Sequence, residues 1–169
     1  LAAVNKNGLW GFIDKTGKFI IEPQFKNTLG FHEGFAPVEI NEKWGYIDKT
    51  GKAIIEPKFD EAFAFSEEIG IISLDGKRGY IDRQGNIIIP PKFENSGGFS
   101  EGLASADFGD KYGYINKKGE IVIKPQFDQA QEFQDGLALV DVNFKWGMID
   151  KTGKFIIKPK YNFLEVFSE

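Results

Sequence analysis

The sequence predicts an all-β fold made of five tandem repeats, and three observations support this prediction. First, a pair of residues ending in glycine recurs every 34 residues, at Trp10-Gly11, Trp44-Gly45, Arg78-Gly79, Tyr112-Gly113 and Trp146-Gly147. Second, glycine and proline hold fixed places in every copy, which disfavours the helical repeats that share this period. Third, the apolar residues form short runs rich in β-branched and aromatic side chains, as is typical of strands.

The five copies divide the chain into residues 1–33, 34–67, 68–101, 102–135 and 136–169, which together form one predicted domain, residues 1–169. A second set of residues keeps the same spacing: Gly17, Gly51, Gly85, Gly119 and Gly153. A third set does so as well: Pro23, Pro57, Pro91, Pro125 and Pro159. Because the spacing never changes, we expect the copies to fold alike.

Within each copy the pattern predicts an antiparallel meander of three strands. Residues 36–40 are expected to pair with residues 44–48, and a tight turn then leads into a strand at residues 53–55. Each turn opens with Asp or Asn and closes with Gly, as a type I turn ending in a left-handed glycine requires. The opening residues are Asp14, Asp48, Asp82, Asn116 and Asp150.

Proline is expected to end the third strand, because it has no N–H to donate to a ladder. The segment that follows it, residues 59–65 in the second copy, is compatible with a short fourth strand or with a wide connection. The pattern does not decide between the two.

The strands are apolar on successive residues, so both faces of each small sheet need cover. Stacking one copy on the next supplies that cover, either in a propeller-like ring or in an open β-superhelix. The large residue before each recurring glycine is expected at the seam between neighbouring copies. Arg78 fits there because its guanidinium plane stacks on a neighbour while its charged end reaches water.

Composition excludes several classes of site. The net charge is −4, with both signs interspersed, which argues against nucleic acid as a partner. No apolar run is long enough to span a membrane. Cysteine is absent, which rules out disulfides and thiolate metal sites, and the single histidine, His32, cannot form a His-rich metal site.

No catalytic constellation is predicted either. Carboxylates recur beside glycine at equivalent places, at Glu33, Glu101 and Asp135, which indicates turn residues rather than one asymmetric active site. The "DFGD" segment, residues 107–110, lacks the other motifs of a kinase and is interpreted as a hairpin turn. The sequence therefore predicts no catalytic residue, no metal and no cofactor.

The segment "KWGYIDKTGK", residues 43–52, with the proline and phenylalanine that follow it, resembles the bacterial WG-containing repeat, also called the KWG repeat. The resemblance covers all five copies. It implies a tandem β-repeat protein of a kind common in bacteria, often exported or anchored at the cell envelope, with no established catalytic residues. The third copy departs from the pattern at Arg78 and Asn86, and the fourth at Tyr112.

The leading functional expectation is a non-enzymatic interaction module or scaffold that binds another protein, in an extracellular or cell-envelope location of a bacterium. The alternative is a glycan or cell-wall binding module that uses the repeated aromatic residues as stacking platforms. The candidate binding residues are Trp10, Trp44, Arg78, Tyr112 and Trp146. A third hypothesis, a hydrolase, requires two carboxyls about 5–10 Å apart in a cleft.

Overall fold

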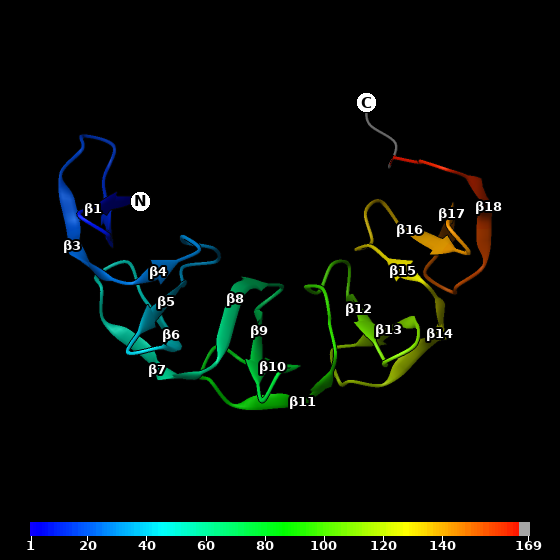
Figure 1. Ribbon diagram of the computed structural model, residues 1–169, viewed down its shortest axis with the longest axis horizontal. Coiled ribbons are helices and arrows are strands. Elements are labelled where there is room, and N and C mark those ends of the chain that lie inside the picture. The colour runs from blue at the N-terminus through cyan, green and yellow to red at the C-terminus, as the bar shows by residue number, and fades with distance from the viewer. Residues whose placement is uncertain (166–169) are drawn as a thin grey trace. The chain divides into compact units, whose positions relative to one another are not determined.

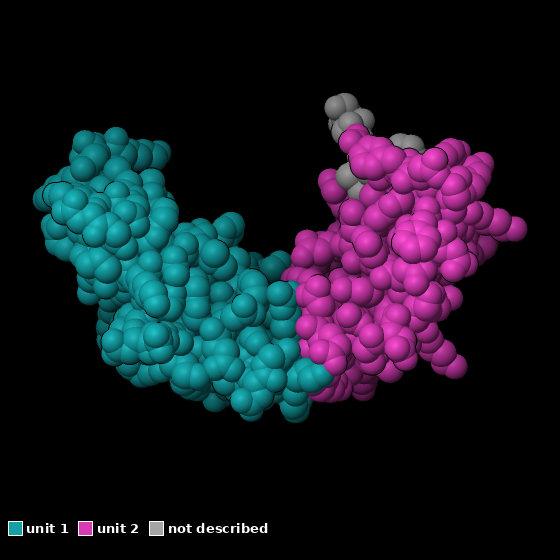
Figure 2. Space-filling model, viewed as in Figure 1, with its two compact units in different colours: residues 1–91 teal, residues 92–169 magenta. Residues whose placement is uncertain are grey.

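The computed structural model describes residues 1–165, and within them the chain forms strands and turns but no helix. The strands make five antiparallel sheets, so the all-β prediction is confirmed. No helix capable of crossing a lipid bilayer occurs in these residues. The chain divides into two compact units, unit 1 at residues 1–91 and unit 2 at residues 92–169 (Figure 2).

Unit 1 contains three sheets, and in each of them the strands follow one another in chain order (Figure 1). The first sheet consists of β1 (Ala2–Lys6), β2 (Leu9–Ile13) and β3 (Phe19–Phe25). The second consists of β4 (Asn27–Thr28), β5 (Ala36–Ile40), β6 (Lys43–Ile47) and β7 (Ala53–Phe59). The third consists of β8 (Glu61–Ser66), β9 (Ile69–Leu74), β10 (Lys77–Ile81) and β11 (Ile87–Phe93).

Unit 2 contains two sheets of the same kind. The fourth sheet consists of β12 (Leu103–Asp107), β13 (Tyr112–Asn116) and β14 (Ile121–Phe127). The fifth consists of β15 (Gln129–Ala130), β16 (Leu137–Val142), β17 (Lys145–Asp150) and β18 (Phe155–Tyr161). The predicted pairing of the first two strands in a copy is confirmed, because Ala36 lies opposite Ile47 and Ile40 lies opposite Lys43.

In the first, second and fourth copies the segment after the proline forms a further strand, and that strand pairs with the next copy. In the second sheet Thr28 of β4 lies opposite Val38 of β5, and in the third sheet Ala62 of β8 lies opposite Ile72 of β9. Each of these sheets therefore takes its first strand from the copy that precedes it. The fourth sheet differs, because the corresponding residue, Ser96, makes only an isolated bridge to Ala106.

The prediction that proline ends the third strand is wrong. Strand β7 continues through Pro57 to Phe59, which lies opposite Trp44, and the pairing register shifts between Trp44 and Tyr46. Pro57 is tolerated because β7 is the last strand of its sheet, at the edge, and bulges at this point.

The glycine of each recurring pair lies against this bulge. A Cβ atom on Gly45 would approach the Ile55 carbonyl oxygen to 2.5 Å and the Pro57 nitrogen to 2.7 Å, closer than such atoms approach in proteins. The same approach occurs at Gly11, Gly79, Gly113 and Gly147. Glycine thus recurs here because the bulged strand leaves no room for a side chain.

The predicted turns are confirmed, and the aspartate at their start organises them. Oδ1 of Asp48 accepts hydrogen bonds from the Thr50 N–H at 2.8 Å, the Thr50 hydroxyl at 2.6 Å and the Lys52 N–H at 3.1 Å. Gly51 has φ +89° and donates its N–H to the Asp48 carbonyl oxygen at 3.0 Å. The Thr50 hydroxyl bond is the main cause that holds the pKa of Asp48 below its usual value.

Replacing Asp14, Asp48 and Asp150 together by Asn is expected to make folding less sensitive to acid. The pKa of each of these carboxyls is lowered in the folded protein, mainly by the hydroxyl of the following threonine. Ionisation therefore stabilises the fold above the ordinary carboxyl pKa, and this contribution is lost as the pH falls through the lowered pKa. Asn keeps the acceptor, as Asn116 does in the fourth copy.

The measurement is the urea midpoint at a series of pH values from neutral to acidic. The variant should show a smaller fall in midpoint than the unmodified protein, and an equal fall in both would contradict the prediction. The control replaces the same residues by Ala. This change removes the hydrogen-bond acceptor, so it should lower the urea midpoint at neutral pH and not only at acidic pH.

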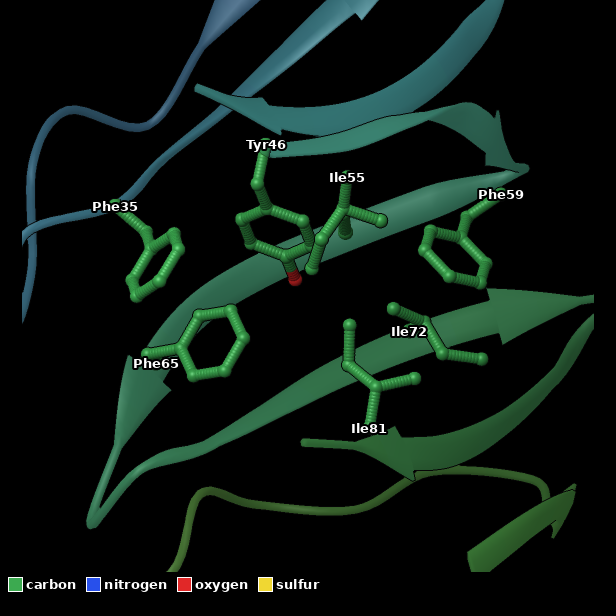
Figure 3. Packing of buried hydrophobic residues seen from close by; sticks show 8 residues of the cluster. Phe35, Tyr46, Ile55, Phe59, Phe65, Ile72 and Ile81 are labelled. Carbon is green, nitrogen blue, oxygen red and sulfur yellow. The ribbon is translucent and has the colours of Figure 1, made fainter. Parts of the chain in front are cut away.

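The hydrophobic core lies between consecutive sheets of each unit. In unit 1, Tyr46, Ile55 and Phe59 of the second sheet pack against Phe65 and Ile72 of the third (Figure 3). A second cluster joins the first and second sheets, and a third joins the two sheets of unit 2. Stacking of consecutive sheets, which both predicted arrangements share, is confirmed within each unit.

A buried tyrosine hydroxyl also links neighbouring sheets. The Tyr46 hydroxyl donates to the Phe63 carbonyl oxygen at 2.8 Å, and the Ile71 carbonyl oxygen lies 3.2 Å away. In unit 2 the Tyr114 hydroxyl donates to the Gln131 carbonyl oxygen at 2.7 Å. Burial raises the pKa of both tyrosines, so they remain protonated donors.

Candidate functional site

The five predicted binding residues lie at or next to the start of a strand, and each belongs to a different sheet. All five are half-buried: Trp10, Trp44, Arg78, Tyr112 and Trp146. The fold therefore distributes them one to a sheet and does not gather them into a single cluster. Their role in binding stays a prediction, whereas their packing can be described.

The predicted position at the seam is confirmed for three of the rings. Trp10 packs against the core between the first and second sheets, and Trp44 packs against the core between the second and third. Tyr112 packs against the core of unit 2. Trp146 lies opposite Tyr161 in the ladder of the fifth sheet.

Arg78 stacks on an aromatic ring, as predicted, but the ring belongs to its own sheet. Its guanidinium carbon lies 4.4 Å from the centre of the Phe63 ring in β8. Phe63 comes from the segment whose structure the sequence left open, so this partner was not identifiable beforehand. Arg78 and the tryptophans share a half-buried position that accepts either a flat ring or a flat cation.

The recurring carboxylates are turn residues, as interpreted, and they also bind the next copy. Glu33 has φ +49°, and its carboxylate accepts hydrogen bonds from the N–H groups of Glu67 and Glu68, both at 2.9 Å. Arg83 donates to the Glu33 carbonyl oxygen at 3.0 Å, and its guanidinium carbon lies 4.4 Å from the centre of the Phe35 ring.

Unit 2 repeats this arrangement with lysine in place of arginine. Glu101 accepts a hydrogen bond from the Gly136 N–H at 3.0 Å, and Lys151 Nζ lies 2.9 Å from its Oε2. The bond from Lys151 is the main cause that lowers the pKa of Glu101. These carboxylates therefore have structural partners that account for their recurrence.

His32 is exposed and shares two backbone hydrogen bonds with Phe35, so it is a solvated turn residue. Across residues 1–165, no group of three or more His, Cys, Asp or Glu residues is arranged to hold a metal ion.

Unit 2 contains a groove of about 850 Å³. One side is formed by the segment that leads into the fourth sheet, together with Ser105 and Tyr112. The other side is formed by residues 128–134, which include β15. The lining residues of the first side are Asn95, Ser96, Gly97, Ser100, Ser105 and Tyr112.

The groove lies where a glycine replaces a larger residue of the other copies. The positions equivalent to Gly97 hold Leu29, Phe63, Gln131 and Glu165. In the third sheet Phe63 fills this position beside Arg78, whereas in the fourth sheet Gly97 has no side chain to place beside Tyr112. Because Gly97 and Gly98 have no side chains, they leave a hollow that is lined by polar side chains.

Gly97 borders both sides of the groove. A Cβ atom on Gly97 would lie 2.9 Å from Ser105 Oγ and 3.6 Å from Glu132 Oε1. The same Glu132 oxygen accepts the Gly98 N–H at 3.1 Å. A side chain at position 97 would thus enter the space between Ser105 and Glu132.

The groove is lined mainly by polar groups, and Asp128, one of its two carboxylates, is paired with a cation. Lys111 donates to Oδ1 of Asp128, and the Asn143 N–H donates to Oδ2 at 2.7 Å. The bond from Lys111 is the main cause that lowers the pKa of Asp128. Asn95 Nδ2 donates to the Tyr112 hydroxyl at 3.2 Å.

The comparison with protein families gives a match along most of the chain. The model of the WG containing repeat matches residues 10–44, 44–77, 79–112, 112–145 and 146–169. This chain belongs to the WG-containing repeat family. A search of curated proteins found no match to this WG-repeat chain.

Solved structures of Hsv2 from Kluyveromyces lactis resemble this WG-repeat chain in fold. One Hsv2 structure has a TM-score of 0.59 at 12% identity and covers 91% of this chain and 58% of Hsv2. A second, with complete loop 6CD, has a TM-score of 0.60 at 12% identity, covering 91% of this chain and 57% of that one. The chain spans less than two thirds of Hsv2, and at this identity the similarity shows a propeller-like β fold alone.

Of the residues that line the groove, only Tyr112 is among the predicted binding residues of this WG-repeat chain. The remaining residues were missed. A signal for them exists, because "NSGGFS", residues 95–100, differs from "EAFAFS", residues 61–66, at four positions, two of which are glycine. The repeat pattern identifies residues that recur in every copy, whereas the groove depends on Gly97, which does not recur.

Proposed function

We propose that this WG-repeat chain is a non-enzymatic module that binds another protein through the last strands of its sheets. The observation that carries this proposal is one exposed aliphatic side chain at the same position of each last strand. In unit 1 these are Ile20, Ile54 and Ile88, with exposed fractions of 45%, 40% and 38%. Val122 and Ile156 hold the equivalent positions in unit 2 and are exposed too. Repeat arrays commonly use surface positions that recur from copy to copy as extended binding surfaces.

The neighbours of these side chains favour a protein as the partner. Along β7, Ile54, Glu56 and Lys58 are exposed, whereas Ile55 and Phe59 are buried. An aliphatic residue beside charges of both signs suits a protein surface of mixed polarity better than a polyanion. Pro57 interrupts the hydrogen-bonding edge of β7, so the partner is held by side-chain contacts and not by adding a strand.

The resemblance to bacterial WG repeats supports the cell envelope as the place of this interaction, since repeats of that kind are often exported or anchored there. An envelope protein is therefore the proposed partner. Glycan binding, the second candidate, is favoured by a different surface, the groove of unit 2.

The test is photo-crosslinking in the native bacterial cell, with a crosslinkable residue in place of Lys58. We expect a specific protein adduct that disappears when Ile20, Ile54 and Ile88 are replaced by Ser. A matched control replaces Leu9 and Leu29, which are 42% and 52% exposed, by Ser. An adduct that persists in the triple variant, or is lost equally in the control, would contradict the proposal, as would the absence of any adduct.

A further inference from the structure

The groove of unit 2 exposes an unusual concentration of hydrogen-bonding groups. Gln129, Gln131 and Gln134 line one side and are exposed, and their carboxamide groups make no hydrogen bond within residues 1–165. Gln129 and Gln131 flank Ala130, whose side chain packs against the core. Alternation along the strand therefore directs both carboxamides away from the core.

The opposite side of the groove adds hydroxyl groups and one aromatic ring. Ser100 Oγ donates to the Phe133 carbonyl oxygen at 2.6 Å, which ties the two sides together and leaves its lone pairs as acceptors. The ring of Tyr112 is half-buried and lines the groove. A flat apolar surface thus lies opposite groups that both donate and accept hydrogen bonds.

The charge of the lining restricts the ligand. No Lys or Arg lines the groove, Asp128 is paired with Lys111, and Glu132 is the other acidic group of the lining. Phosphates and other polyanions would meet no cation there. A peptide anchored by apolar side chains would find only Tyr112 and Ala130, because Phe133 is buried.

A neutral ligand rich in hydroxyls matches this lining. Each hydroxyl both donates and accepts, as each carboxamide does, and a carboxylate accepts from neighbouring hydroxyls. A pyranose ring with equatorial hydroxyls also presents a C–H face that packs on an aromatic ring. We propose that the groove of unit 2 binds a neutral oligosaccharide of pyranose units with equatorial hydroxyls. Its volume lies in the range of small-molecule sites, about 300–1,000 Å³.

This inference rests on the second candidate function, glycan binding, and is separate from the proposed protein-binding surface. The groove is formed by residues 95–105, Tyr112 and residues 128–134, whereas the protein surface consists of the aliphatic residues on the last strands. A failure of either proposal would leave the other standing.

The test is a titration of the ¹⁵N-labelled protein with cellotetraose and with chitotetraose, followed by amide chemical shifts. We expect shifts at Gly97, Tyr112 and Gln131, with millimolar or tighter affinity for at least one of these probes. Tripolyphosphate, a polyanion that has no pyranose ring, is the contrasting probe and should bind at least about tenfold more weakly, a difference of about 1.4 kcal/mol.

Two variants test the site itself. Gly97→Phe reproduces Phe63, the equivalent residue of the second copy, fills the hollow and should abolish binding. Gln131→Ala, at an exposed position that does not endanger folding, should weaken binding at least about tenfold. Gln84→Ala is the control, because Gln84 is exposed in a turn of unit 1, and it should leave the affinity unchanged.

Three results would overturn the proposal. They are no shift with either saccharide, shifts confined to residues outside the groove, and equal affinity in Gln131→Ala and the unmodified protein. Selection of peptides that bind the groove, without binding of either saccharide, would assign it to a protein partner instead.

Discussion

Replacing Gly45 by alanine is expected to lower the free energy of unfolding by about 3 kcal/mol, the upper end of the usual cost of overpacking. The added Cβ would lie 2.5 Å from the Ile55 carbonyl oxygen and 2.7 Å from the Pro57 nitrogen. Both are backbone atoms of the bulged strand, so no rotamer change relieves the overlap. Moving the bulge would displace Ile55, which is buried in the core between the second and third sheets.

The control is Gly8→Ala, which separates overlap from backbone strain. Gly8 has φ +87°, and a Cβ there would have no atom within 4 Å, so only the left-handed conformation is penalised, by about 1 kcal/mol. Unfolding in urea, followed by tryptophan fluorescence, measures both variants. Equal losses in the two would show that the bulge yields to the added methyl group and would refute the explanation given for the Trp-Gly pair.

Replacing Phe65 by alanine is expected to cost about 4 kcal/mol, within the range for deleting a buried aromatic ring. Phe65 is 3% exposed; its ring stacks on Phe35 at 4.9 Å between centres and meets Tyr46 edge-on at 5.0 Å (Figure 3). It lies in β8, the strand that the third sheet takes from the preceding copy. Loss of this ring would leave a cavity between two sheets.

A matched replacement, Phe144→Ala, provides the control. Phe144 is 90% exposed, and removing its ring should change stability by less than about 0.5 kcal/mol. The same urea titration measures both. If Phe65→Ala proved as mild as this control, β8 would not contribute to the core, and the assignment of the fourth strand to the next sheet would be wrong.

The sequence predicts those features of the fold that depend on neighbouring residues. The turn at Asp48 is determined by an acceptor at its start and a left-handed Gly51 at its end, both visible in the sequence. The pairing of β5 with β6 follows from the short connection between them. Proline misled the prediction at Pro57, because β7 bulges there and resumes its pairing at Phe59, and the bulge is accommodated by Gly45 of the partner strand.

The candidate site is harder to predict from the sequence, because it depends on contacts between copies. The seam position of Trp44 was predictable from the apolar character of its strand and from Arg78 at the same place in the third copy. The groove was not, since Gly97 matters only once Phe63 is seen to occupy the equivalent position beside Arg78. That comparison requires knowing which sheet the segment after each proline joins.

The second, third and fifth sheets each take their first strand from the preceding copy. This arrangement also affects how such proteins can change in length. Because each of these strands lies near the end of one copy but pairs within the next sheet, the sheets are offset from the sequence copies. Excision or duplication of any 34 consecutive residues would reconnect equivalent strands, leaving each remaining sheet complete. A gene encoding this array can therefore gain or lose one copy at any breakpoint in phase with the repeat, and its product would still fold.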